Sequence, residues 1–175
     1  MKSEEIIRVI YDNFYRYFKS GDMIIGGSYF YSLLGIPVNP TFKDIDIIVD
    51  ISKDHILYEI NDFFKNSNFK YNKEASFIKN FTGDNLISCI VFDDDYPMID
   101  ILRNNFSTNL SEIEILPGVF SNYQSNDKLI EVYDILLNAF RDMGREDSVN
   151  KFSILKNFYE NNDIGKIIKN NGTRF

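Results

Sequence analysis

The segment 43–50, Lys-Asp-Ile-Asp-Ile-Ile-Val-Asp, constrains the fold most, because it alternates carboxylates with β-branched residues. Alternate side chains of a strand share a face, so the pattern predicts a strand with Asp44 and Asp46 on one face and Ile45 and Ile47 in the core. Aspartate is a poor strand former, and two neighbouring carboxylates repel each other unless a cation lies between them. The pair therefore predicts a site for a hard divalent cation such as Mg²⁺.

A glycine turn precedes this strand. The short apolar run 23–25 is followed by Gly26, Gly27 and Ser28, and then by a segment with helical character. A glycine-rich turn that opens a helix offers backbone N–H groups to a phosphate. We expect this turn to hold phosphates, with Gly27 and Ser28 contacting the β- and γ-phosphates of a bound triphosphate.

A third carboxylate follows much later. Asp100 stands between Ile99 and Ile101 in the apolar segment 98–102. A buried carboxylate without a partner is unfavourable by several kcal/mol, so Asp100 is expected to face a cation or a hydrogen-bond donor. If this strand lies beside 43–50, Asp100 joins Asp44 and Asp46 around one or two Mg²⁺ ions, which would orient a triphosphate and activate an acceptor hydroxyl. Alternatively, Asp100 is the general base for that hydroxyl.

In this order, Gly26-Gly27-Ser28, Asp44-Ile45-Asp46-Ile47 and Ile99-Asp100-Ile101 resemble the signature of the DNA polymerase β-type nucleotidyltransferase superfamily. The resemblance covers about 23–102 and is greatest to small stand-alone members and abortive-infection toxin-like members. It implies an α+β fold, a mixed twisted β-sheet backed by helices.

The resemblance also implies an activity. A nucleoside monophosphate would pass from an NTP to a hydroxyl acceptor with Mg²⁺ or Mn²⁺ as cofactor, and Asp44, Asp46 and Asp100 would be the catalytic metal ligands. The acceptor stays open between RNA such as tRNA, a protein and a small molecule. The preferred NTP and the oligomeric state also stay open.

Several basic residues are candidates for contacts to phosphate or acceptor, although such residues are more often ordinary surface charge. Arg103 has the best claim because it lies close to Asp100 along the same strand, and Lys43 directly precedes Asp44. The others are Arg141, Arg145 and Lys151.

Hydrophobic periodicity and turn residues predict the remaining elements. Helices are expected over 3–18, 29–34, 52–64 (capped by Ser52), 127–143 and 147–159, with 164–168 as a possible extension. Strands are expected over 23–25, 43–50, 69–71, 76–81, 86–92 and 98–102. The acidic run 93–95 is interpreted as a solvated turn, and 103–126 as irregular with a possible strand at 113–116. We expect a core over 1–106 and a helical C-terminal segment over 107–175 that packs on the same domain.

Composition excludes several classes of site and partner. Cys89 and His55 are the single cysteine and histidine, which rules out an intramolecular disulfide and any multi-histidine or cysteine-based metal centre. The net charge of −7 argues against unspecific binding along nucleic acid. No apolar stretch approaches the ~20 residues that span a bilayer, and the acidic start is unlike a signal peptide. The sequence therefore predicts a cytoplasmic protein without a membrane partner.

Two other function classes stay open. The chain could be a catalytically inactive member of the same fold that binds nucleotides or another protein. It could also be a structural subunit, as its aromatic-rich helices suggest. The arrangement of the three carboxylates discriminates between the first alternative and an enzyme, because only a competent site needs Asp100 to point at Asp44 and Asp46.

Overall fold

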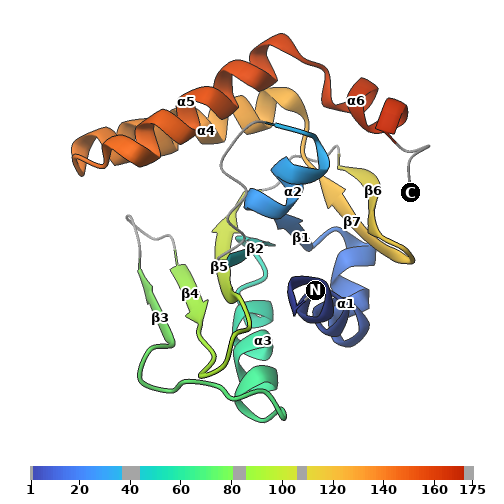
Figure 1. Ribbon diagram of the computed structural model, residues 1–175, viewed down its shortest axis with the longest axis vertical. Coiled ribbons are helices and arrows are strands. Elements are labelled where there is room, and N and C mark those ends of the chain that lie inside the picture. The colour runs from blue at the N-terminus through green and yellow to red at the C-terminus, as the bar shows by residue number, and fades with distance from the viewer. Residues whose placement is uncertain (1, 37–43, 81–85, 106–109, 172–175) are drawn as a thin grey trace.

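The computed structural model describes residues 2–36, 44–80, 86–105 and 110–171 and has an α+β architecture (Figure 1). A mixed five-stranded sheet lies at the centre, with helices on both sides. The predicted fold class is confirmed. Within the described residues, no helix is long and apolar enough to cross a membrane.

The central sheet brings together strands that are distant in the sequence. Its strands are β1 (Met23–Gly26), β2 (Asp44–Asp50), β3 (Phe77–Asn80), β4 (Leu86–Ile90) and β5 (Met98–Asn104). They lie in the order β1-β2-β5-β4-β3, with β2 and β5 parallel and all other neighbours antiparallel. Because β5 lies between β2 and β4, Asp100 on β5 comes to lie beside Asp44 and Asp46 on β2.

One face of this sheet forms the main hydrophobic core. Burial alternates strictly along β2: Ile45, Ile47 and Val49 are buried, whereas Asp44, Asp46, Ile48 and Asp50 are half-buried. Together with Ile99 and Ile101 of β5, these side chains pack against α1 (Lys2–Ser20) and α3 (His55–Lys65). The alternation therefore commits the aspartates to the opposite face, as the sequence pattern predicts.

The helices α2 (Gly27–Leu33), α4 (Asn126–Asp142), α5 (Glu146–Asn161) and α6 (Ile164–Asn171) lie on the side of the aspartates. In Figure 1 the long α4–α5 pair runs along the top of the view, with α2 between it and the sheet. These helices share a second hydrophobic cluster built around Phe30, Tyr133, Leu155 and Tyr159. Two cores thus flank the carboxylate face, one behind the sheet and one among the covering helices.

The region expected to be irregular contains a β-hairpin. Strands β6 (Ser111–Leu116) and β7 (Val119–Tyr123) pair in antiparallel fashion, and Gly118 adopts a positive φ in the turn between them. The hairpin is anchored to the main sheet because the Ser121 hydroxyl accepts a hydrogen bond from the Ile25 N–H at 2.9 Å. The possible strand at 113–116 is confirmed as part of β6, whereas the irregular course expected around it was wrong for β7, and the C-terminal helices begin at Asn126.

Smaller corrections concern α3 and the segment after it. Ser52 does not cap the helix, because the Asp50 carboxylate accepts hydrogen bonds from its N–H and hydroxyl, and the helix begins at His55. The predicted strand 69–71 is reduced to one bridge between Tyr71 and Phe92. C-terminal to α5, the predicted extension is a separate helix, α6.

Candidate metal and nucleotide site

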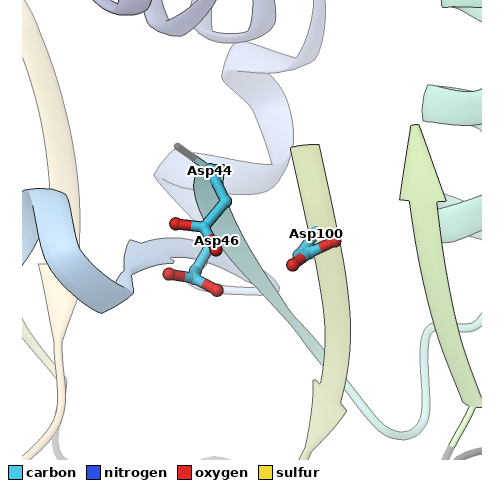
Figure 2. Close-up of side chains that lie close together, drawn as sticks. All are labelled: Asp44, Asp46 and Asp100. Carbon is cyan, nitrogen blue, oxygen red and sulfur yellow. The ribbon is translucent and has the colours of Figure 1, made fainter. Parts of the chain in front are cut away.

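Asp44, Asp46 and Asp100 converge on one point of the sheet. Asp44 and Asp46 share a face of β2, and Asp100 lies directly beside Asp46 in the parallel register of β2 and β5. One carboxylate oxygen from each of the three residues lies within 4.8 Å of the other two. Figure 2 shows the three side chains close together, Asp44 and Asp46 on β2 and Asp100 on the neighbouring strand β5.

The oxygen separations suit one divalent cation. Mg²⁺ binds oxygens at roughly 2.0–2.1 Å and Ca²⁺ at roughly 2.3–2.6 Å, so ligands on opposite sides of such an ion stand about 4–5 Å apart. The donor set is carboxylate oxygen alone, which hard cations prefer. The three residues therefore fit a hard divalent metal ion.

The environment of Asp100 disfavours the ionised form of its carboxyl group. Burial raises the pKa of the Asp100 carboxyl above its ordinary value, and the nearby negative charge of Asp44 adds to the rise. The thiol of Cys89, which stands opposite Asp100 across β4 and β5, opposes that rise by hydrogen bonding to the carboxylate. A cation between the carboxylates would favour the ionised form of Asp100.

The glycine turn fits closely against this cluster. β1 ends at Gly26, the N-cap of α2, and Gly27 has a φ of +62°. A Cβ atom at Gly27 would lie 2.7 Å from the Cβ atom of Asp46 and still closer to its carboxylate. Glycine at position 27 thus serves both the turn and the space that the Asp46 carboxylate occupies.

A cavity of about 280 Å³ opens beside the carboxylates, between the sheet and the C-terminal helices. Asp44, Asp46 and Gly27 belong to its lining. Most other lining side chains are apolar or aromatic; they include Ile24 and Ile48 of the sheet, Phe30 of α2, and Leu129, Val132, Leu136 and Ala139 of α4. An apolar chamber with a charged cluster in its wall is the usual composition of a small-molecule site.

Lys151 brings a positive charge to the same cavity. It lines the chamber from α5, and its Nζ atom lies 5.9 Å from the ring centroid of Tyr31 and 5.7 Å from that of Phe152. Tyr31 in turn accepts a hydrogen bond of 2.9 Å from the hydroxyl of Tyr133 on α4. α2, α4 and α5 are thereby joined around the chamber.

Arg103 does not lie where the sequence suggested. Its guanidinium donates two hydrogen bonds, at 2.8 and 2.6 Å, to the carboxylate of Asp54, next to the start of α3. Arg103 is three positions from Asp100, and side chains alternate between the two faces of a strand. The Arg103 side chain therefore leaves β5 on the core side of the sheet, although the residue borders the cavity. The guanidinium thus forms an ion pair with Asp54.

The other predicted site residues have mixed outcomes. Gly26 and Gly27 are at the expected turn, and Ser28 lies in the first turn of α2. Lys43 lies outside the described residues. Among the remaining basic candidates, Lys151 lines the cavity, whereas Arg141 contacts Asn138 at the surface and Arg145 lies over the ring of Phe140.

Two residues near the site escaped sequence reasoning. Cys89 was considered only as a possible disulfide or zinc ligand, although its place in an apolar strand already allowed a neighbour on the sheet. Gln124 lines the cavity between β7 and α4, in the stretch expected to be irregular. Recognition of the hairpin would have placed it, because the alternation at 112–115 and the Pro-Gly pair at 117–118 are a strand-and-turn signal.

In comparisons with known proteins, no family model matches the chain, and no curated protein matches it significantly.

Proposed function

We propose that this protein is a metal-dependent nucleotidyltransferase of the DNA polymerase β type, which transfers a nucleoside monophosphate from an NTP to a hydroxyl acceptor. The observation that carries the proposal is the convergence of Asp44, Asp46 and Asp100, of which Asp44 and Asp46 line a chamber between sheet and helices. The proposed metal is Mg²⁺ or Mn²⁺, held by these three residues. When bound, it supplies charge neutralisation for the triphosphate and for the developing charge of the transfer.

Other residues of the chain are proposed to bind the phosphates and the base of the nucleotide. The backbone at Gly27 and Ser28 begins α2 beside Asp46 and is the proposed contact for the β- and γ-phosphates. Lys151, on the opposite wall, is the proposed cation for a phosphate or for the ribose side of the nucleotide. The apolar wall of α4 would hold the base and exclude water.

In the alternative to a three-ligand metal site, Asp44 and Asp46 hold the metal and Asp100 accepts the proton of the acceptor hydroxyl. The pKa of the Asp100 carboxyl is raised. Asp100 lies on β5, at the edge of the cluster that is separate from the glycine turn. A carboxylate of raised pKa is a better proton acceptor at neutral pH. Its orientation toward the other two aspartates supports a catalytic site over an inactive binding module of the same fold.

The proposal is tested by nucleotide binding and transfer with matched aspartate variants. Labelled NTPs, Mg²⁺ and three acceptor classes (tRNA, a protein mixture and small hydroxyl compounds) are incubated with the wild-type chain. Transfer should disappear in the double variant Asp44→Ala, Asp46→Ala. Asp62→Ala, which removes an exposed carboxylate from α3, should retain it. If the wild type shows no Mg²⁺-dependent NTP binding by calorimetry, the proposal is wrong.

The acceptor remains a proposal among RNA, protein and small molecules, and the toxin-like role remains a prediction. Growth arrest on expression that Asp46→Ala relieves would support that role. Harmless expression of an active enzyme would count against it.

A further inference from the structure

Asn104 carries a carboxamide at the end of the cavity that lies away from the carboxylates. It is the last residue of β5, it belongs to the cavity lining, and it is only half-buried. Gln124, the other carboxamide residue of the lining, is 2% exposed. Asn104 is therefore the carboxamide that remains accessible to a ligand in the cavity.

The register of β2 and β5 places Asn104 on the face of the sheet that carries the aspartates. Successive side chains of a strand alternate between its faces, so Asp100, Leu102 and Asn104 leave β5 on the same side. Ile48 lies beside Leu102 in this register, and both belong to the cavity lining. At roughly 3.3 Å per residue, Asn104 lies about 13 Å from Asp100 along the strand.

Apolar side chains line the cavity between the carboxylates and Asn104. They include Ile48 and Leu102 on the sheet, and Val132 and Leu136 on α4. A space between apolar walls suits a flat ring. A nucleotide with its phosphates at the carboxylates would thus place its base between the sheet and α4, with the edge of the base at Asn104.

A local hydrogen bond determines which amide atom of Asn104 is left for a ligand. The Asn105 N–H donates to the Asn104 Oδ1 atom at 2.8 Å, and a backbone N–H needs an acceptor, so this contact identifies the amide oxygen. The Asn104 carbonyl oxygen accepts from the Ile51 N–H at 2.9 Å, which holds the backbone in place. Within the described part of the chain, no residue accepts a hydrogen bond from the Nδ2 amino group. Asn104 therefore offers a ligand a hydrogen-bond donor.

We propose that Asn104 determines the base specificity of the site and selects bases with a carbonyl oxygen at their edge, guanine or uracil, over adenine and cytosine. The Nδ2 donor pairs with O6 of guanine or O4 of uracil, whereas adenine and cytosine carry an amino group at that position. Two donors that face each other in an apolar cavity both lack an acceptor, which is unfavourable. This inference rests on the proposed function, since it assumes that the cavity receives an NTP.

The test compares ITP with ATP, because hypoxanthine has O6 in place of the amino group of adenine and the same ring size. In calorimetry with Mg²⁺, we expect the wild type to bind ITP about three- to tenfold more tightly than ATP, the size of one hydrogen bond. Asn104→Asp keeps an oxygen for the Asn105 N–H and replaces the Nδ2 donor by an acceptor, so it should bind ATP more tightly than ITP. The added negative charge acts on both ligands alike, because the two affinities are compared within one protein.

Inorganic tripolyphosphate with Mg²⁺ separates this inference from the proposed function. It should bind the wild type and Asn104→Ala equally, because it does not extend to the base region. If the wild type binds ITP and ATP equally, or if Asn104→Asp keeps the wild-type order, the role of Asn104 is overturned and the proposed function stands. If the wild type binds no NTP, the proposed function falls and this inference with it. Should Asn104→Asp fail to fold, Asn104→Ala decides, because it should bind ITP and ATP alike.

Discussion

Gly27 lies so close to Asp46 that a Cβ atom at position 27 would stand 2.7 Å from the Cβ atom of Asp46. Any residue other than glycine at position 27 would therefore place its side chain in the space that the Asp46 carboxylate occupies. This relationship couples the glycine motif to the acidic motif within the fold itself.

Gly27→Ala should displace the Asp46 carboxylate. We expect the affinity for Mn²⁺, measured by electron paramagnetic resonance, to fall by about 10- to 100-fold, the range seen when ligand positioning is disturbed. The matched control is Gly144→Ala, because Gly144 also has a positive φ but no atom within 4 Å of its would-be Cβ. That control should lose only about 1–2 kcal/mol of stability from the strained backbone and keep its metal affinity. Equal metal affinity in both variants would contradict the coupling.

Asp100→Asn should stabilise the metal-free protein at neutral pH. Because the folded-state pKa of Asp100 is raised, mainly by burial, its contribution to stability is greatest at acidic pH and is lost as the pH rises through that pKa. Denaturant unfolding between about pH 4 and 7 should show the wild type losing stability relative to the variant. Asp62→Asn, at an exposed site, should follow the wild type.

Mg²⁺ should make the wild type more stable than Asp100→Asn at neutral pH. An ion that binds only the folded state raises the stability of the wild type, whereas Asp100→Asn lacks a ligand and should respond little. A wild-type protein whose stability at pH 7 is unchanged by millimolar Mg²⁺ would contradict both the metal site and its dependence on Asp100.

Cys89 should be inert toward alkylation in the folded protein. Burial, with hydrogen bonding to Asp100, raises the pKa of its thiol to about 12. At pH 8 the reactive thiolate is then rarer than in the unfolded chain by a factor on the order of a thousand, and iodoacetamide labelling followed by mass spectrometry should slow to match. Asp100→Asn should accelerate labelling. Native protein that reacts as fast as the urea-unfolded chain would contradict this prediction.

Arg103→Lys should affect stability and not nucleotide binding. The Arg103 side chain is 12% exposed and that of Asp54 43%, so the ion pair is partly screened. Loss of the two-point contact should lower the free energy of unfolding by about 1–2 kcal/mol. Affinity for Mg²⁺-tripolyphosphate should stay within about twofold, whereas Lys151→Met should reduce it about tenfold, as loss of a charge-assisted contact does. If Arg103→Lys lowered the affinity for Mg²⁺-tripolyphosphate and Lys151→Met did not, Arg103 and not Lys151 would be the phosphate ligand.

Much of the site could be predicted because its geometry is local. The alternation of Asp44, Ile45, Asp46 and Ile47 determines which side chains share a face, and this needs no knowledge of other strands. The glycine turn was predictable for the same reason. These features lie within single elements, where sequence patterns translate directly into structure.

The remainder depends on contacts between distant segments. That Asp100 stands beside Asp46, and that Cys89 stands opposite Asp100, follows from strand order and register, which no local pattern specifies. The ion pair of Arg103 with Asp54 is likewise not predictable from the closeness of Arg103 to Asp100 along the strand. Ser52 lost its expected capping role to competition from the Asp50 carboxylate two residues away.

The parallel pairing of β2 with β5 has a consequence for how this protein folds. β3, β4 and β5 follow one another as antiparallel neighbours and need only short loops to form, whereas Asp46 meets Asp100 across 53 residues of intervening chain. Closing so long a loop costs entropy that only the contacts of the nearly complete sheet offset. We therefore expect β2 and β5 to pair late in folding. Partly folded chains would then lack the paired carboxylates, so the proposed binding of metal and nucleotide would begin only with the completed domain.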